Sequence, residues 1–178
     1  SRHRAVSGAV KTPTPQLMAM ATGVWLNPWW EVPPSIAPEV RGKKGYVAVK
    51  GADGKVQRWR QPPGPSNAHG HIKIVMYNPQ NIYLHDTTAK SLFDAKARAY
   101  SHGCIRTEHI MLLAERLLSE GAPVAGTPEA EGKTLWTPEK VRETVASRKT
   151  VQANFPKPLP VYTVYMCSAA LQDGWVKK

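Results

Sequence analysis

Apolar and polar residues alternate along several short stretches of the chain, and this alternation indicates strands with one buried face. The early stretches are residues 46–50, 56–60, 71–77 and 81–85. The first two flank a turn that contains Asp53 and Gly54, so they predict a β-hairpin. The other two are joined by residues 78–80, which read NPQ and favour a turn.

Two later segments follow the period of a helix instead. An apolar stripe predicts the first of them, and it consists of Ile110, Leu113, Leu117 and Leu118. Thr107 can cap the N-terminus of this helix, and Gly121 can end it. The second helix is predicted from Thr137, as its N-cap, to about Arg148, with Pro138 in the first turn.

Two more strands are predicted near the end of the chain, at residues 151–155 and 161–167, and the second contains Cys167. Residues 86–100 are polar and irregular, which indicates a surface loop. A chain of 178 residues suits one domain with a sizeable core. We therefore predict a single, mainly β domain with two helices over residues 1–178.

The net charge of +11 and a pI of about 9.8 suggest an anionic partner. The basic residues are scattered and form no nucleic-acid motif, so we expect a soluble basic surface and no nucleic-acid partner. No apolar run reaches the ~20 residues of a membrane span. No apolar segment follows the basic residues 1–4, so we expect either a cytoplasmic protein or a piece of a processed one.

Residues 101–106 read SHGCIR and carry the candidate chemistry. A free thiol titrates at ~8.5, so a nucleophilic cysteine needs a lowered pKa or a base. Cys104 comes just ahead of a predicted helix, whose N-terminus would favour the thiolate. His85 ends a predicted strand and could turn its imidazole onto the sulfur. We predict Cys104 as nucleophile and His85 as base. The alternatives are an inert buried cysteine and a histidine with a structural hydrogen bond.

The neighbours of these two residues have predicted roles as well. Gly103 would let backbone approach a substrate closely, and the N–H groups of Gly103 and of the nucleophile could bind a developing oxyanion. Asp86, or a backbone carbonyl, could fix the tautomer of the base. His102 is the rival base, but neighbours on an extended segment point apart, so we expect it to line or orient the site. Ser101 is either a hydrogen-bond donor in the site or a loop residue.

A histidine followed after 15 residues by SHGCIR resembles the signature of the YkuD-type L,D-transpeptidases, cysteine acyltransferases of the bacterial cell wall. Residues 27–34, NPWWEVPP, and 60–70, RQPPGPSNAHG, resemble segments of the larger Gram-negative branch of that family. The resemblance implies a β-sandwich or barrel-like catalytic fold, with residues 33–60 as a hairpin flap over the site. It also implies that the first strands of the family, ahead of residue 11, are absent, which favours a processed or excised piece.

The resemblance implies an activity. The thiolate attacks the carbonyl of the third residue of a tetrapeptide stem of peptidoglycan and releases D-Ala. An amine then takes the acyl group, either from a second stem, which gives a 3→3 crosslink, or from a lipoprotein lysine. Such an enzyme works in the periplasm or cell envelope, needs no cofactor and reacts with carbapenem-type inhibitors. Water as the acceptor, which makes an L,D-endopeptidase or carboxypeptidase, and a non-catalytic wall-binding module are the alternatives.

Several further residues are candidates for substrate binding. Arg106 could hold a substrate carboxylate or brace the loop. Trp29, together with the neighbouring tryptophan, and Tyr83 could line a groove, although such aromatic residues are more often core. Asn67 lies in a matched segment and could contact peptide backbone, whereas His69 stands where the resemblance predicts an aliphatic residue. No CxxC or HExxH pattern is present, so we expect no metal. A buried thiol, rather than a disulfide, is expected for the second cysteine.

Overall fold

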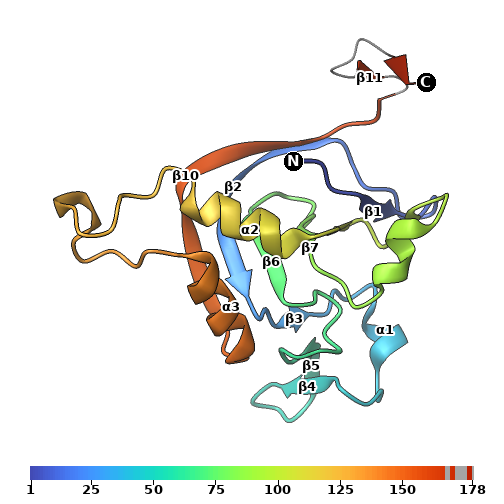
Figure 1. Ribbon diagram of the computed structural model, residues 1–178. Helices are drawn as coiled ribbons and strands as arrows, with labels where there is room; N and C mark the ends of the chain where they lie inside the picture. Colours follow the sequence, from blue (N-terminus) through green and yellow to red (C-terminus); the bar gives the residue numbers. More distant parts are fainter. Residues whose placement is uncertain (167–168, 171–175, 178) are drawn as a thin grey trace.

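The computed structural model describes residues 1–166, 169–170 and 176–177, the last two pairs by their backbone alone (Figure 1). Cys167, for which the sequence predicts a buried thiol, lies outside the described residues. The end of the described chain is a short antiparallel pair, β11 (Ala169–Ala170) with β12 (Val176–Lys177).

The framework of the described residues is a seven-stranded sheet with the order β10-β2-β6-β7-β9-β1-β8. The neighbours β7 and β9 run parallel, as do β1 and β8, and the other neighbours are antiparallel. This confirms the mainly β prediction. The bounds are β1 Ala5–Gly8, β2 Leu17–Leu26, β6 Ile72–Met76, β7 Leu84–His85, β8 Ala99–Ser101, β9 Ile105–Thr107 and β10 Val151–Thr163.

A second, three-stranded sheet has the order β3-β5-β4. It contains the predicted hairpin, formed by β4 (Val47–Lys50) and β5 (Val56–Gln61), and adds β3 (Trp30–Glu31) at the edge of β5. The one-turn helix α1 (Ala37–Val40) lies between β3 and β4 in the chain. Two short 3-10 turns complete the described elements, η1 at Lys90–Asp94 and η2 at Pro128–Ala130.

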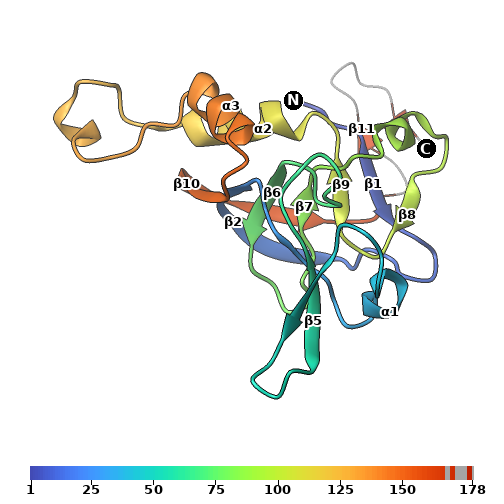
Figure 2. The ribbon, with the colours of Figure 1, turned by 90° about the horizontal axis from the view of Figure 1, so that it is seen from below.

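Helices α2 (Ile110–Ser119) and α3 (Pro138–Ala146) cover one side of the large sheet and form the core with β2, β6 and β10. Figure 2 shows these helices on one side of the sheet and the β4–β5 hairpin on the other. The two predicted helices are therefore present, and the Thr137 side chain caps α3 by accepting a hydrogen bond from the Lys140 backbone at 3.3 Å.

The predicted start of α2 is wrong. Thr107 is the last residue of β9, where its backbone is in register with Ala5 of β1, so it cannot also cap a helix. The helix begins at Ile110, after His109 in a left-handed conformation with φ of 50°. Its end agrees with the prediction, because Gly121 follows the last turn with φ of +75°.

Three other expectations about strands need correction. The strand β1 precedes residue 11, contrary to the expectation that no strand does, and the long strand β2 is not predicted from the alternation. The two strands predicted near the end of the chain are one strand, β10, with an irregular register between Asn154 and Leu159. Of predicted strand 81–85, only Leu84–His85 pairs, because Asn78 binds the backbone of residue 82 and closes a turn there.

Candidate active site

Three adjacent strands place a row of charged or titratable residues on one face of the large sheet. Lys73 of β6 is in register with His85 of β7, and His85 is in register with Arg106 of β9. Residues in register across neighbouring strands point to the same face. The fold therefore sets an imidazole between an ammonium and a guanidinium, although the three residues are far apart in sequence.

Cys104 lies in the tight turn between β8 and β9. Gly103 has φ of +113°, a conformation that favours glycine, and a Cβ there would lie 3.1 Å from Ile82 Cδ1. Ser101 Oγ closes the turn, since it donates to the Cys104 carbonyl at 2.5 Å and accepts from the Gly103 N–H at 3.1 Å. The buried Thr14 hydroxyl donates to the Gly103 carbonyl at 2.7 Å. The turn is therefore held from both sides, which fixes the position of the sulfur.

A cavity of about 490 Å³ is lined by His85 and Arg106 of this row. Its walls bring together five of the predicted site residues, namely Cys104, His85, Arg106, Ser101 and His102. The opposite wall is formed by residues 33–46, which include α1 and which we call the cap segment. The strands β4 and β5 beyond it do not line the cavity. Of the predicted flap 33–60, only the first half borders the site.

His85 is 5% exposed, and its surroundings fix both its tautomer and its charge. Its Nδ1 lies 2.5 Å from the backbone carbonyl of Asp86. A carbonyl only accepts, so Nδ1 carries the proton and Nε2 keeps its lone pair. Burial lowers the pKa of His85 to about 4, against the raising effect of the Asp86 carbonyl, and Arg106 and Lys73 lower it further. At neutral pH the ring is a neutral base.

The Cys104 thiol is also neutral at rest. Burial raises its pKa, and the Tyr83 backbone and Lys73 offset this only in part. Its Sγ lies 3.6 Å from the carbonyl of Asn81. The predicted help from a helix N-terminus is wrong, because α2 begins at Ile110 and β9 separates it from the cysteine. The resting pair is therefore a thiol and an imidazole rather than an ion pair.

The predicted oxyanion site loses one of its two donors. The N–H of Gly103 already donates to Ser101 Oγ, so it is not free for a substrate oxygen. The backbone N–H of Cys104 makes no hydrogen bond within the described residues and is the remaining candidate. Ser101 is buried, braces the turn and lines the cavity.

His102 points toward the cap segment. Its Nε2 lies 3.5 Å from Glu39 Oε1 of α1, and both side chains are about half exposed. This contact links the turn that carries Cys104 to the wall across the cavity. The position agrees with an orienting role, and it differs from that of His85 in the sheet.

The comparisons with known proteins bear on this site. Residues 1–138 match the YkuD family, described as an L,D-transpeptidase catalytic domain. The chain belongs to this family. It is also 28% identical over 197 aligned residues to a Haemophilus influenzae protein named "Putative L,D-transpeptidase". The alignment covers 96% of this chain but 37% of that relative, so the chain spans little more than a third of the relative's length.

Within this L,D-transpeptidase domain, Asn67 does not have the predicted role. It is fully buried, and a side chain without exposed surface cannot contact a substrate. Its Oδ1 accepts from the His69 backbone at 2.8 Å, and its amide donates to three backbone carbonyls, those of Pro28, Gln61 and Pro62. Asn67 therefore holds the loop that leads into β6.

The aromatic residues predicted to line a groove differ in whether they reach the cavity. Trp29 does not line the cavity and lies beneath the Arg60 guanidinium, 4.2 Å from its ring centroid. Tyr83 also lies outside the cavity wall, and the Lys73 Nζ sits 3.7 Å from its ring centroid. Trp30 is the residue of this group that lines the cavity. The assignment of Trp29 and Tyr83 as direct substrate contacts is therefore not supported by their positions.

The structure adds His69 to the site. Its ring is 6% exposed, lines the cavity and packs against His85, with 4.6 Å between centroids and the ring planes tilted by 47°. Burial lowers its pKa well below the ordinary value, and its Nδ1 has no hydrogen-bond partner within the described residues. The Trp30 ring also packs against His69, with 5.7 Å between the centroids. The sequence signal was available, since a histidine stands where the family resemblance predicts an aliphatic residue.

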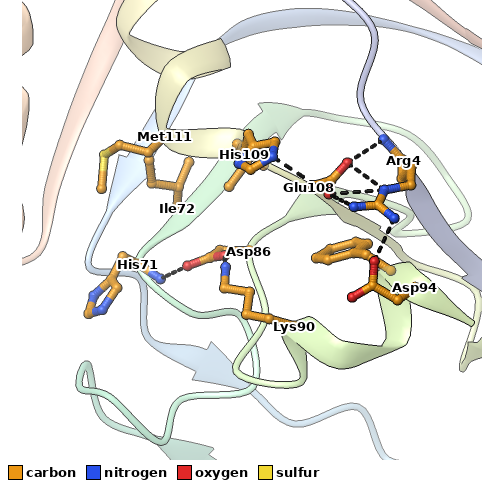
Figure 3. Close-up of a pocket in the computed structure, with 11 residues that line it drawn as sticks. Arg4, His71, Ile72, Asp86, Lys90, Asp94, Glu108, His109 and Met111 are labelled. Carbon is orange, nitrogen blue, oxygen red and sulfur yellow. Dashed lines mark hydrogen bonds and ion pairs between the residues drawn. The ribbon is translucent and has the colours of Figure 1, made fainter.

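A second cavity of about 500 Å³ lies between the N-terminal segment, η1 and the start of α2 (Figure 3). The Asp86 carboxylate faces it, pairs with Lys90 and accepts from the His71 backbone at 3.0 Å. The charged groups that line this second cavity pair with one another, and its described lining contains no cysteine or serine nucleophile. We therefore place the chemistry in the cavity that contains Cys104.

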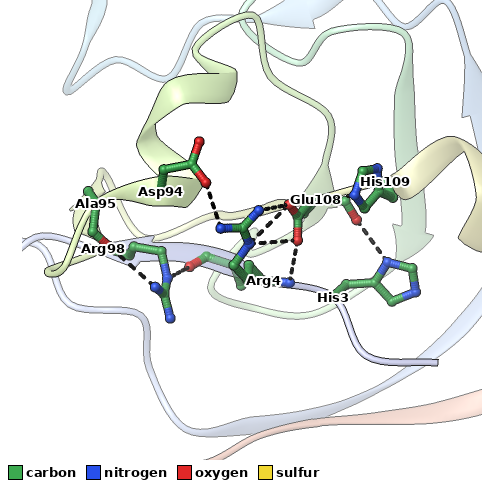
Figure 4. A network of polar contacts seen from close by, with 8 residues as sticks. His3, Arg4, Asp94, Ala95, Arg98, Glu108 and His109 are labelled. Atoms are coloured by element: carbon green, nitrogen blue, oxygen red, sulfur yellow. Dashed lines mark hydrogen bonds and ion pairs between the residues drawn. The ribbon is translucent and has the colours of Figure 1, made fainter.

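An ion-pair network beside this second cavity anchors β1 (Figure 4). The Arg4 guanidinium binds Glu108 at 2.5 Å and Asp94 at 2.6 Å. Arg98 donates to the Ala5 carbonyl at 3.1 Å. Because Glu108 directly follows β9, the network ties the first strand to the strand that follows Cys104.

We expect Arg4→Met to lower the melting temperature, and the loss to shrink at acid pH. The Arg4 guanidinium lowers the pKa of Glu108 from 4.5 to about 2. A carboxyl with a depressed folded pKa stabilises the protein above its unfolded pKa, and this stabilisation is lost as pH falls from about 4.5 toward 2. Thermal unfolding of both proteins at pH 6 and pH 3 tests this. Arg2→Met is the matched control, and an equal loss at both pH values would rule out the ion pair as the cause.

Proposed function

We propose that the protein is a peptidoglycan L,D-transpeptidase in which Cys104 is the nucleophile and His85 the general base. The observation that supports this best is the shared cavity, in which a neutral imidazole with a fixed tautomer and a free thiol are found together. Membership of the YkuD family supplies the reaction class. A non-catalytic wall-binding module would not need either group.

The first half-reaction begins when His85 Nε2 takes the proton of Cys104 Sγ. The sulfur then attacks the carbonyl carbon of the third residue of a tetrapeptide stem, and the oxyanion that forms is placed to accept from the Cys104 N–H. The tetrahedral intermediate collapses as the imidazolium of His85 returns its proton to the departing amine of D-Ala. A thioester on Cys104 remains.

In the second half-reaction, an amine attacks the thioester carbonyl and His85 takes a proton from it. The carbon–sulfur bond breaks, and the electron pair returns to sulfur, which recovers its proton. A stem peptide as acceptor gives a 3→3 crosslink, and a lipoprotein lysine gives an anchored protein. Water as acceptor gives a free tripeptide. Such chemistry places the enzyme at the cell envelope. No helix within the described residues is both long and apolar enough to cross a membrane.

Arg106 is proposed to bind a carboxylate of the stem peptide. Its guanidinium is half-buried, lines the cavity and has no carboxylate within ion-pair distance among the described residues. A planar guanidinium can bind a carboxylate with two hydrogen bonds. Peptidoglycan stems carry such groups at their C-terminus, which would place the scissile bond over Cys104.

We expect Arg106→Gln to raise KM for a tetrapeptide substrate about 10- to 100-fold, the range for one hydrogen bond to a charged group. The kcat should change less, because the guanidinium is placed to bind the stem and not the reacting carbonyl. Arg106→Lys should recover part of the affinity, since the charge stays but the fork is lost. Steady-state kinetics with all three proteins test this. An Arg106→Gln enzyme with an unchanged KM would mean that Arg106 braces the loop.

The function itself is tested by incubating the protein with a disaccharide-tetrapeptide and analysing the products by mass spectrometry. The expected product is a crosslinked dimer that has lost one D-Ala, and it should be absent with Cys104→Ala. Free tripeptide without dimer would replace the transferase by a hydrolase. If the folded protein changes no stem peptide, alone or with an amine acceptor, the proposal is wrong.

A further inference from the structure

Lys73 carries a charge that the fold leaves without an anionic partner. It is half-buried on β6, and its Nζ lies over the Tyr83 ring at 3.7 Å from the centroid. Among the described residues, no carboxylate lies within ion-pair distance of this ammonium. Glu31 acts on it from a greater distance and is itself bound by Arg58 at 3.1 Å. A partly desolvated cation without a counter-charge costs free energy.

The ammonium is held beside the nucleophile. Tyr83, which lies under Lys73, accepts a hydrogen bond at its carbonyl from the backbone of Ile105, the residue after Cys104, at 2.8 Å. Tyr83 directly precedes β7 and Cys104 directly precedes β9, so the Tyr83 ring under the Lys73 ammonium belongs to the residue whose backbone lies next to the cysteine turn. The aromatic face fixes the ammonium by a cation–π contact and leaves its charge unneutralised.

We propose that Lys73 is the counter-ion of the Cys104 sulfur, and that it stabilises the thiolate whenever the sulfur becomes an anion. This inference rests on the proposed function, since it takes Cys104 as the nucleophile. The anion forms first when the Sγ–H bond breaks and the proton moves to His85 Nε2. It forms again when the thioester carbon–sulfur bond breaks and the electron pair returns to sulfur. A preorganised charge acts at both moments without reorganisation.

The other charged or titratable groups around the sulfur cannot replace this role. Burial lowers the pKa of Lys73, and Cys104 is the first of the charges that raise it again. Arg106 is in register with the base and chiefly affects His85. The remaining titratable groups around the cavity and the sulfur are His69, Tyr83, His102, Glu39, Lys43 and Tyr46. Burial keeps His69 and the two tyrosines uncharged at neutral pH, because it lowers the pKa of the histidine and raises those of the tyrosines. His102 and Glu39 lie 3.5 Å from each other, and Lys43 belongs to the cap segment on the opposite wall.

The pH dependence of alkylation tests the proposal. Iodoacetamide modification of Cys104 is followed by mass spectrometry from pH 5 to 11 in the folded protein. The thiol limb is the part of the pH–rate profile in which the alkylation rate rises as Cys104 ionises. In Lys73→Met we expect the thiol limb to move up by about one pH unit, the size of shift that one nearby charge produces. A thiol pKa about one unit higher lowers the thiolate fraction at pH 7 about 10-fold, and the higher nucleophilicity of the more basic thiolate offsets part of this loss. The rate at pH 7 should therefore fall about 3- to 10-fold. Methionine keeps the length of the side chain and so the packing on Tyr83.

Two controls separate charge from shape. Lys73→Arg keeps the charge and should keep the thiol limb near that of the wild type. Lys55→Met, in the exposed turn of the β4–β5 hairpin, removes the same charge far from the site and should leave the limb unchanged. A Lys73→Met profile that overlays the wild type, or a Lys73→Arg profile displaced as far as that of Lys73→Met, would overturn the proposal.

A second measurement leaves Lys73 intact and covers the case in which its variants do not fold. Coupling between two titrating groups is reciprocal, so removing the thiolate must affect the ammonium. The NMR signal of the Lys73 side-chain carbon next to Nζ should titrate at lower pH in Cys104→Ala than in the wild type. Identical titrations in the two proteins would mean that the charges are not coupled.

These readouts report on the thiol and not on peptidoglycan. A thiol limb that depends on Lys73, in a protein that turns over no stem peptide, would support the counter-ion and reject the proposed function. If the enzyme turns over stem peptides but its thiol limb does not change on substitution of Lys73, the proposed function is supported and the counter-ion is rejected.

Discussion

Replacing Cys104 by alanine is expected to abolish both the covalent adduct with a carbapenem and the turnover of a tetrapeptide stem. Cys104 is a free thiol in the cavity, and in the proposed mechanism both reactions form an acyl–sulfur bond on it. Intact-protein mass spectrometry after incubation with the carbapenem measures the adduct directly. The wild type should gain the mass of the inhibitor, and Cys104→Ala should gain nothing.

The control for this result is Cys104→Ser. A hydroxyl has nearly the shape of the thiol but a far higher pKa, so this variant should fold and show little or no adduct. An adduct of undiminished yield on Cys104→Ala would place the nucleophile on another residue. It would also remove the basis of the proposed function.

Replacing His85 by alanine is expected to slow acylation of Cys104 by about 10²- to 10⁴-fold, the usual range for a general base. The effect should be large because the resting pair is neutral, so no preformed thiolate replaces the base. The pKa of His85 is lowered to about 4, and the imidazole is a base only above that pH. The wild-type rate should therefore fall as pH drops through about 4 rather than 6.5. Stopped-flow acylation over pH 3 to 9 tests this.

His102→Ala is the matched control, since it removes an imidazole two residues from the nucleophile. His102 contacts Glu39 at 3.5 Å and has no backbone partner that fixes a tautomer within the described residues. Its loss should cost less rate and leave the limb near pH 4 in place. Whole profiles must be compared, because the pair titrates together. If His102→Ala abolishes the pH dependence and His85→Ala does not, the base is His102.

Several features could be predicted because they depend on residues close together in the chain. The hairpin of β4 and β5 follows from alternation around a turn with Asp53 and Gly54. The cap of α3 follows from Thr137 and Pro138. The family follows from SHGCIR and the upstream His85, since this order of residue types is specific. These are local signals, and the packed fold preserves them.

Other local signals were overridden by pairing over long distances. Thr107 has the character of a helix cap, but β9 pairs with β7 through residue 106 and with β1 through residue 107. The long strand β2 carries glycine and alanine at buried positions instead of large apolar residues, because β10 and the helices approach it closely. A pattern based on large apolar residues therefore misses it.

The arrangement and the charge states of the site residues depend on the tertiary structure more than on any local sequence pattern. By itself the sequence determined the family, and it predicted Cys104 and His85 as the reactive pair. Only the tertiary structure decided that Lys73, His85 and Arg106 form one row, because sheet register joins residues that are distant in sequence. It also decided the charge states, since burial raises the pKa of Cys104 and lowers that of His85. Desolvation is a property of the packed environment, and no local motif encodes it.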